Sequence, residues 1–176
     1  GLLEKAPLVA RHLVSRDLFS GWGVRTLGAA LRGYNPMSYH CGSVWPHDSA
    51  IVAAGLMRYG FIEEAHTIMS GLVGAAPSFG NRLPELFAGL GRDDFRFPVS
   101  YPTSCSPQAW AAASPLLFLR TMLRFEPDIR NAELRIAPAV PEWIGSLRLE
   151  QVPLMGGNLS VEVEGENMRL IDIPDG

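Results

Sequence analysis

The chain has 176 residues, and its 47% hydrophobic content fits one ordinary domain with enough apolar surface for a core. Its net charge of −3 and isoelectric point near 5.8 argue against nucleic-acid binding, because no basic stripe could neutralise phosphates. The sequence has no uncharged apolar run long enough to span a bilayer and no signal-peptide pattern at its start, so we expect a soluble, cytoplasmic protein.

Helical spacing predicts the first element of the chain. Apolar residues recur at helical intervals from Pro7 to Phe19, and the glycines of the following Ser20–Gly23 stretch end that helix. Residues 24–31 are ambiguous between irregular chain and a short helical turn. Residues 33–36, Gly-Tyr-Asn-Pro, are a loop signal.

A helical hairpin is predicted next, followed by a long loop. Residues from Ser49 to Tyr59 are nearly all apolar, as in a helix buried on several sides, and Gly60 ends this helix. A second helix with one apolar face follows at once, and so short a connection requires an antiparallel hairpin. Residues 76–103 are rich in proline and glycine, and a loop of this length in a compact domain is usually functional.

The character of the chain changes after Pro127. Before it, Ser106 and Pro107 open a helix that runs to about Phe125, with a kink expected at Pro115. After it, four segments alternate with period two and are separated by proline, glycine and asparagine, which predicts short antiparallel strands. These segments are 133–136, 147–150, 159–163 and 168–173.

Three polar stretches that border helices carry the groups capable of chemistry. The first, Tyr39–Asp48, combines two histidines, a tryptophan, a serine, a tyrosine and a carboxylate. The second is Arg82–Phe87 and the third is Pro102–Trp110. Functional groups are disproportionately found on such loops. The alternative for the first stretch is structural, with its tryptophan in the core and its aspartate capping the next helix.

Glu85 is the candidate for acid–base chemistry. An isolated carboxylate among apolar side chains is where a shifted pKa and general acid or base work become possible. The alternative is an exposed glutamate in the first turn of a short helix. Aromatic residues in or beside the loops suit the apolar faces of a sugar ring, although core packing also explains any single tryptophan. These aromatic residues are Trp22, Trp45, Trp110, Tyr39 and Tyr101.

Metal and nucleophile chemistry have weaker signals. His40, Cys41 and His47 match no recognised zinc pattern, and no second cluster supplies further ligands. Cys105 lies beside a helix start that could lower its pKa, but no partner is evident, and no serine has the glycine-flanked nucleophile signature. We expect no metal, no cofactor and reduced thiols.

Taken in order, the three stretches resemble the C-terminal half of the amylo-α-1,6-glucosidase (glycogen debranching) family. The matching motifs are Gly42-Ser43-Val44-Trp45-Pro46, Pro84-Glu85-Leu86-Phe87-Ala88-Gly89 and Cys105-Ser106-Pro107-Gln108-Ala109-Trp110. The resemblance implies a mainly α fold, in which residues 1–126 form the C-terminal half of an (α/α)6 toroid. Residues 127–176 would then be a small antiparallel β appendage.

The resemblance also implies an inverting glycoside hydrolase that acts on α-glucan. In that mechanism a carboxylic acid protonates the leaving oxygen, and a carboxylate on the other side of the sugar activates water. Glu85 matches the general base. The implied substrate-binding residues are Tyr39, His40, Trp45, His47, Gln108 and Trp110. Two features depart from the family: the Gly-Trp-Lys-Asp-Ser stretch of the general acid does not occur, and His47 with Asp48 replaces apolar residues found in some relatives.

The family's general acid lies in its N-terminal half, so the expected partners of this chain are that missing half of the barrel and an α-glucan or oligosaccharide. The chain alone should then be inactive, and apolar helix faces at its open edge favour self-association. Two alternatives stand beside this hypothesis. One is a trehalase-like or other α-glycosidase on the same barrel, and the other is a non-catalytic carbohydrate-binding or assembly module.

Overall fold

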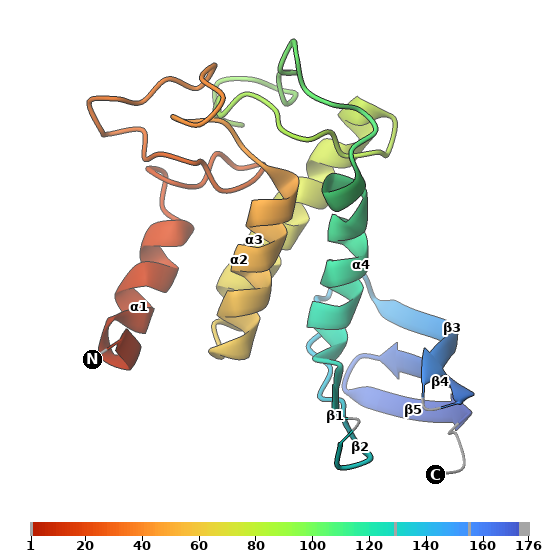
Figure 1. The fold of residues 1–176 in the computed structure, drawn as a ribbon. Coiled ribbons are helices and arrows are strands. Elements are labelled where there is room, and N and C mark those ends of the chain that lie inside the picture. The colour runs from red at the N-terminus through yellow and green to blue at the C-terminus, as the bar shows by residue number, and fades with distance from the viewer. Residues whose placement is uncertain (1, 129, 155, 173–176) are drawn as a thin grey trace. The chain divides into compact units, whose positions relative to one another are not determined.

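The computed structural model describes residues 2–128, 130–154 and 156–172. Figure 1 shows the elements in chain order. The helices are α1 (Leu2–Leu13), α2 (Pro46–Arg58), α3 (Ile62–Ala75), the 3-10 helix η1 (Ala76–Phe79) and α4 (Ala109–Leu123). The strands are β1 (Glu126–Asp128), β2 (Glu133–Arg135), β3 (Ser146–Leu154), β4 (Gly157–Glu164) and β5 (Asn167–Asp172).

The prediction of a mainly α chain that forms half of an (α/α)6 toroid is wrong. The described residues form four α-helices and two antiparallel sheets, which is a mixed α/β arrangement. Only α2 and α3 follow each other directly as a helical hairpin in this part of the chain. The long stretches 14–45 and 80–108 form no helix. Both are interrupted repeatedly by proline or glycine, which break helical hydrogen bonding or favour turns.

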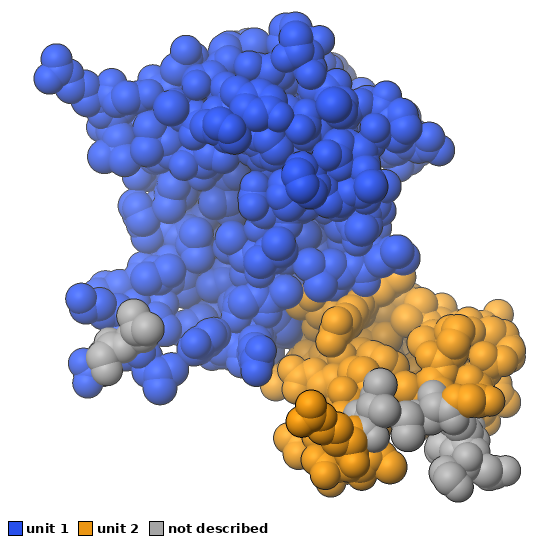
Figure 2. Space-filling view, in the orientation of Figure 1, with its two compact units in different colours: residues 1–118 blue, residues 119–176 orange. Residues whose placement is uncertain are grey.

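The chain divides into two compact units, shown in different colours in Figure 2. Unit 1 is Gly1–Phe118 and unit 2 is Leu119–Gly176. The division falls within α4, whereas the sequence pattern changes at residue 127. Each unit is described by itself below.

The first helix begins and ends earlier than predicted. α1 ends at Leu13, not at Phe19, because Ser15 makes two hydrogen bonds to the carbonyl oxygen of His12. Its backbone N–H donates at 3.1 Å and its hydroxyl at 2.7 Å. These bonds satisfy a carbonyl that continued helix would otherwise have used. The chain from Ser15 onward therefore leaves the helix and belongs to the irregular stretch 14–45.

The predicted helical hairpin is confirmed. α2 starts at Pro46, whose fixed φ suits the first helical position, and the chain turns at Gly60 with φ of 84° before α3. α2 is less enclosed than its composition predicts, because Ile51 on its outer side is 60% exposed. The facing sides of the hairpin are buried. They include Ala50, Ala53, Leu56 and Met57 of α2 and Ala65, Ile68, Met69 and Leu72 of α3.

Extended segments that are far apart in sequence cross-link the loops of unit 1. Val44 pairs with Phe87, and their backbones exchange hydrogen bonds of 2.9 and 3.0 Å. Val44 also pairs with Arg25 on its other side, and Phe87 pairs with Ser100. Both Val44 and Phe87 are fully buried. The predicted long loop therefore has a fixed position relative to the Tyr39–Asp48 stretch, although it has almost no regular structure of its own.

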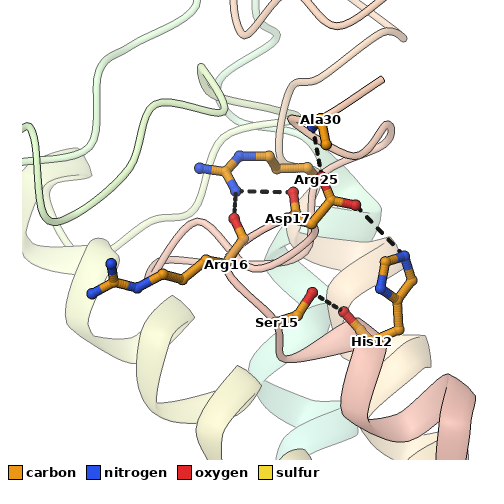
Figure 3. Close-up of polar contacts among 6 residues, drawn as sticks. All are labelled: His12, Ser15, Arg16, Asp17, Arg25 and Ala30. Atoms are coloured by element: carbon orange, nitrogen blue, oxygen red, sulfur yellow. Dashed lines mark hydrogen bonds and ion pairs between the residues drawn. The ribbon is translucent and has the colours of Figure 1, made fainter. Parts of the chain in front are cut away.

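Arg25 holds these loops together from inside the unit. The residue is 8% exposed, and its guanidinium donates to the carbonyl oxygens of Gly89 at 2.7 Å, Arg16 at 2.9 Å and Asp17 at 3.2 Å. Figure 3 shows the guanidinium directed at the carbonyls of Arg16 and Asp17. The carboxylate of Asp17 in turn accepts the backbone N–H of Ala30 at 2.7 Å. One buried cation thus ties two separate loop segments, at residues 16–17 and at Gly89, to its own.

Unit 2 contains the predicted strands and one more. β3, β4 and β5 form an antiparallel sheet, and β1 pairs with β2. Proline at position 127 obscured β1 in the sequence, since proline is disfavoured in strands. Leu123, Leu159, Val161 and Val163 form the buried core of the unit. The last residue of the predicted strand 168–173 lies outside the described residues.

No helix in the described part of the chain is long and apolar enough to cross a membrane. Several large apolar side chains of unit 1 are nevertheless exposed, including Leu3, Leu8 and Val9 on α1. The predicted self-association of the chain stays a prediction.

Candidate functional site

All three polar stretches contribute side chains to a cavity of about 410 Å³ in unit 1. This volume is within the range of small-molecule sites. Its lining residues are Thr26, Tyr39, His40, Trp45, His47, Asp48, Glu85 and Trp110. Candidate residues from positions 39 to 110 of the sequence therefore share one hollow.

Glu85 lies in this cavity as a buried, fully bonded carboxylate. Its residue is 7% exposed and lies outside any helix, so the alternative of an exposed glutamate in a helical first turn does not apply. The phenol of Tyr39 donates to Oε1 at 2.7 Å, and the backbone N–H of Cys105 donates to Oε2 at 3.2 Å. The backbone N–H of Glu85 returns a bond to the Cys105 carbonyl at 3.0 Å. Each carboxylate oxygen therefore has a donor.

These donors favour the ionised form of Glu85. The hydrogen bond from Tyr39 and then the one from the Cys105 backbone hold the pKa of the Glu85 carboxyl below its ordinary value, against the opposing effect of burial. The same hydrogen bond to Glu85 is the main cause that raises the pKa of Tyr39 to about 12. At neutral pH the pair is therefore a carboxylate and a neutral phenol. Such a carboxylate can accept a proton but has none to donate.

Trp45 forms an interior wall of the cavity. It is the residue that precedes the first turn of α2, and its indole Nε1 donates to the Tyr39 carbonyl at 3.1 Å and to Ser43 Oγ at 3.0 Å. Its ring meets the Tyr39 ring edge-on, with centroids 4.8 Å apart, and lies parallel to the His40 ring, with centroids 5.5 Å apart. The residue is only 6% exposed, so Trp45 is a packed residue that also lines the cavity, and its role in binding a substrate stays a prediction.

His47 and Trp110 form a second aromatic pair. Their rings stack with centroids 4.5 Å apart and planes 20° apart, and His47 meets Trp45 edge-on at 5.8 Å. His47 Nε2 lies 3.6 Å from Asp48 Oδ1. Trp110, at the start of α4, is 49% exposed. The proposed structural role of Asp48 as a helix cap is not realised, because no side-chain hydrogen bond caps α2.

Gln108 is the one predicted site residue outside the cavity lining. Its side-chain Oε1 accepts the backbone N–H of Trp110 at 3.0 Å, so this oxygen serves the start of α4. Trp22 also lies elsewhere: it is buried, and Arg92 stacks over its ring at 4.4 Å. Tyr101 does not line the cavity, and its ring meets that of Tyr39 edge-on with centroids 5.8 Å apart.

The structure adds residues that the sequence reasoning did not select. Thr26 and Asp48 line the cavity, and the backbone of Cys105 holds Glu85. The sequence has no signal for Thr26, because it reaches the site through its hydrogen bonds to Gly42 and Ser43 and through the pairing of its neighbour Arg25 with Val44. The role of Cys105 as a backbone donor is equally invisible in a sequence, since any residue but proline has this N–H.

Within the described residues, no three or more His, Cys, Asp or Glu side chains gather in a way that could hold a metal ion. Cys41 and Cys105 are both free and exposed. The negative charge of Glu85 is the main cause that raises the pKa of the Cys105 thiol, which makes it a poor nucleophile at neutral pH.

No protein-family model matches the sequence, and no curated protein matches it.

Proposed function

We propose that this chain supplies the base side of a glycoside hydrolase site of the amylo-α-1,6-glucosidase type. The observation that carries the proposal is the ionised Glu85 carboxylate beside the aromatic wall of Trp45, in a cavity of about 410 Å³. A sugar ring has apolar faces that pack on aromatic side chains and hydroxyl edges that bond to polar groups. A buried aromatic wall next to a proton-accepting carboxylate suits such a ring and a water that attacks it.

In the proposed reaction Glu85 acts as the general base. It takes a proton from a water molecule, whose oxygen forms a bond to the anomeric carbon while the glycosidic carbon–oxygen bond breaks. The leaving oxygen receives a proton from a general acid, and the product has the opposite anomeric configuration. The hydrogen bonds from Tyr39 and the Cys105 backbone orient the carboxylate for this task.

The general acid is proposed to come from protein outside these 176 residues. Asp48 is the other carboxylate in the cavity lining, but its side chain is 59% exposed and lies beside the imidazole of His47. A carboxyl group that must stay protonated at neutral pH is usually enclosed by apolar surroundings. Asp48 lacks such an apolar enclosure.

The test replaces Glu85 with glutamine in a polypeptide that carries both this chain and the proposed acid. Hydrolysis of a branched or limit-digested α-glucan should fall about 100- to 10,000-fold, because the amide is nearly isosteric but accepts no proton. Binding of maltooligosaccharides, followed by tryptophan fluorescence, should persist. Glu63→Gln, at an exposed position in the first turn of α3, is the matched control and should retain turnover.

Two other outcomes decide against the proposal. Unchanged turnover in Glu85→Gln would remove Glu85 from the mechanism. Saccharide binding without turnover in the unaltered protein would favour a carbohydrate-binding module instead. A panel of α-glucosides, trehalose included, separates the debranching hypothesis from another α-glycosidase specificity.

A further inference from the structure

The aromatic residues of the cavity form a row with a buried end and an exposed end. At the buried end, Glu85 is bonded to Tyr39, whose ring contacts Trp45 at 4.8 Å. The ring centroids of Trp45 and His47 are 5.8 Å apart, and those of the stacked His47 and Trp110 rings are 4.5 Å apart. Glu85 and Trp45 are only 7% and 6% exposed, whereas Trp110 at the other end of the row is 49% exposed. The base and Trp110 therefore lie at opposite ends of the same row.

This difference in exposure between the two ends of the row sets the direction of a bound substrate if Glu85 is the base. In an inverting hydrolysis the attacking water and the leaving group lie on opposite faces of the reacting sugar. The water must lie next to Glu85, at the buried end of the row. The leaving group consequently points toward the exposed end, where Trp110 lies.

Trp110 is held ready for such a contact. His47 covers one face of the indole in a nearly parallel stack, with planes 20° apart. The backbone N–H of Trp110 is fixed by Gln108 Oε1 at 3.0 Å. With one face covered and half of the residue still exposed, the other face of the ring remains available to a ligand. An aromatic face that needs no rearrangement loses little conformational entropy on binding.

We propose that Trp110 is a specificity-determining residue whose free face carries the sugar ring of the leaving group. This inference rests on the proposed function. It means that the site favours substrates whose leaving group is itself a saccharide over substrates that release a small group. Contacts with a part of the substrate that does not react are a general source of such preference.

The experiment compares two substrates in the polypeptide that also carries the proposed acid. One is an α-1,6-linked glucose oligosaccharide, which releases a sugar, and the other is α-glucosyl fluoride, which releases only fluoride. The measured quantity is the ratio of kcat/KM for the oligosaccharide to kcat/KM for the fluoride. Trp110→Ala should lower this ratio about tenfold, whereas Trp110→Phe, which keeps an aromatic face, should stay within about threefold of the unaltered protein.

Trp143→Ala is the matched control, because Trp143 is 48% exposed, nearly the same as Trp110, but belongs to unit 2 and does not line the cavity. It should leave the ratio unchanged. Equal losses on both substrates in Trp110→Ala would overturn the inference while leaving the proposed function standing. An unaltered protein that hydrolyses neither substrate would overturn the proposed function and this inference with it. Melting curves of the variants establish that each is folded.

Discussion

The phenol of Tyr39 and the carboxylate of Glu85, 46 residues apart in sequence, share a hydrogen bond of 2.7 Å. The two residues come from segments that the Val44–Phe87 backbone pairing brings side by side. The bond has opposite effects on its partners, because it lowers the pKa of the acid and raises that of the phenol. It thereby defines Glu85 as a proton acceptor and Tyr39 as a permanent donor at neutral pH.

Tyr39→Phe should shift the acid limb of the pH profile to higher pH. The hydrogen bond from Tyr39 is the largest cause that lowers the pKa of Glu85, so its removal makes the carboxylate easier to protonate. The limb of kcat/KM reports the base of the free enzyme and is expected below the ordinary glutamate pKa in the unaltered protein. Tyr101→Phe removes a neighbouring hydroxyl that is not among the donors to Glu85 in the described structure, and its acid limb should not move. An unmoved limb in Tyr39→Phe would contradict the assignment of Glu85 as the base.

Alkylation of Cys105 offers a test of the site geometry that needs no substrate. The negative charge of Glu85 raises the pKa of the Cys105 thiol, and only the thiolate reacts with iodoacetamide. Glu85→Gln removes that charge, so Cys105 should react faster at neutral pH. Cys41, which is also free and exposed, is the internal reference in the same molecule. Equal Cys105-to-Cys41 rate ratios before and after the substitution, measured by mass spectrometry, would place Glu85 away from this thiol.

Arg25→Met should destabilise unit 1 by about 2–4 kcal/mol, because it removes three hydrogen bonds that a charged, enclosed guanidinium donates to loop carbonyl oxygens. These carbonyls belong to Gly89, Arg16 and Asp17. Arg16→Met is the control, since its side chain is 96% exposed and its ion pair with Asp93 lies at the surface. That substitution should change the free energy of unfolding by less than about 0.5 kcal/mol. Chemical denaturation measures both, and equal effects would refute the cross-linking role of Arg25.

Gly89→Ala should damage both stability and the site. A methyl group at this position would collide with the backbone carbonyl oxygen of Gly42, and backbone atoms have little freedom to retreat. The expected loss is about 1–3 kcal/mol, together with weaker saccharide binding, because the displaced segments carry Glu85 and Trp45. Gly55→Ala in α2 has open space around the new methyl group and should be stabilising by about 0.5–1 kcal/mol. Similar melting temperatures for the two variants would show that the loop contact is less tight than described.

Local patterns predicted those parts of the structure that depend on neighbouring residues. The α2–α3 hairpin follows from apolar spacing and Gly60, and the strands of unit 2 follow from alternation between turn residues. The end of α1 was misplaced, because the bonds from Ser15 to His12 compete with helical hydrogen bonding in a way that periodicity does not include. The toroid prediction failed for a related reason. It assumed helices, on the basis of a family resemblance, in stretches whose glycine and proline residues favour loops.

By itself the sequence determined which residues were chemically able to form a site: one carboxylate among apolar neighbours and several aromatic side chains beside loops. Only the tertiary structure decided which of them meet. Long-range pairings at Val44 and Phe87 bring Tyr39 to Glu85, and a local hydrogen bond turns Gln108 toward its own helix. The reason is physical. Loop positions depend on long-range backbone pairing and on buried donors such as Arg25, and neither produces a repeating pattern in the sequence of the loops.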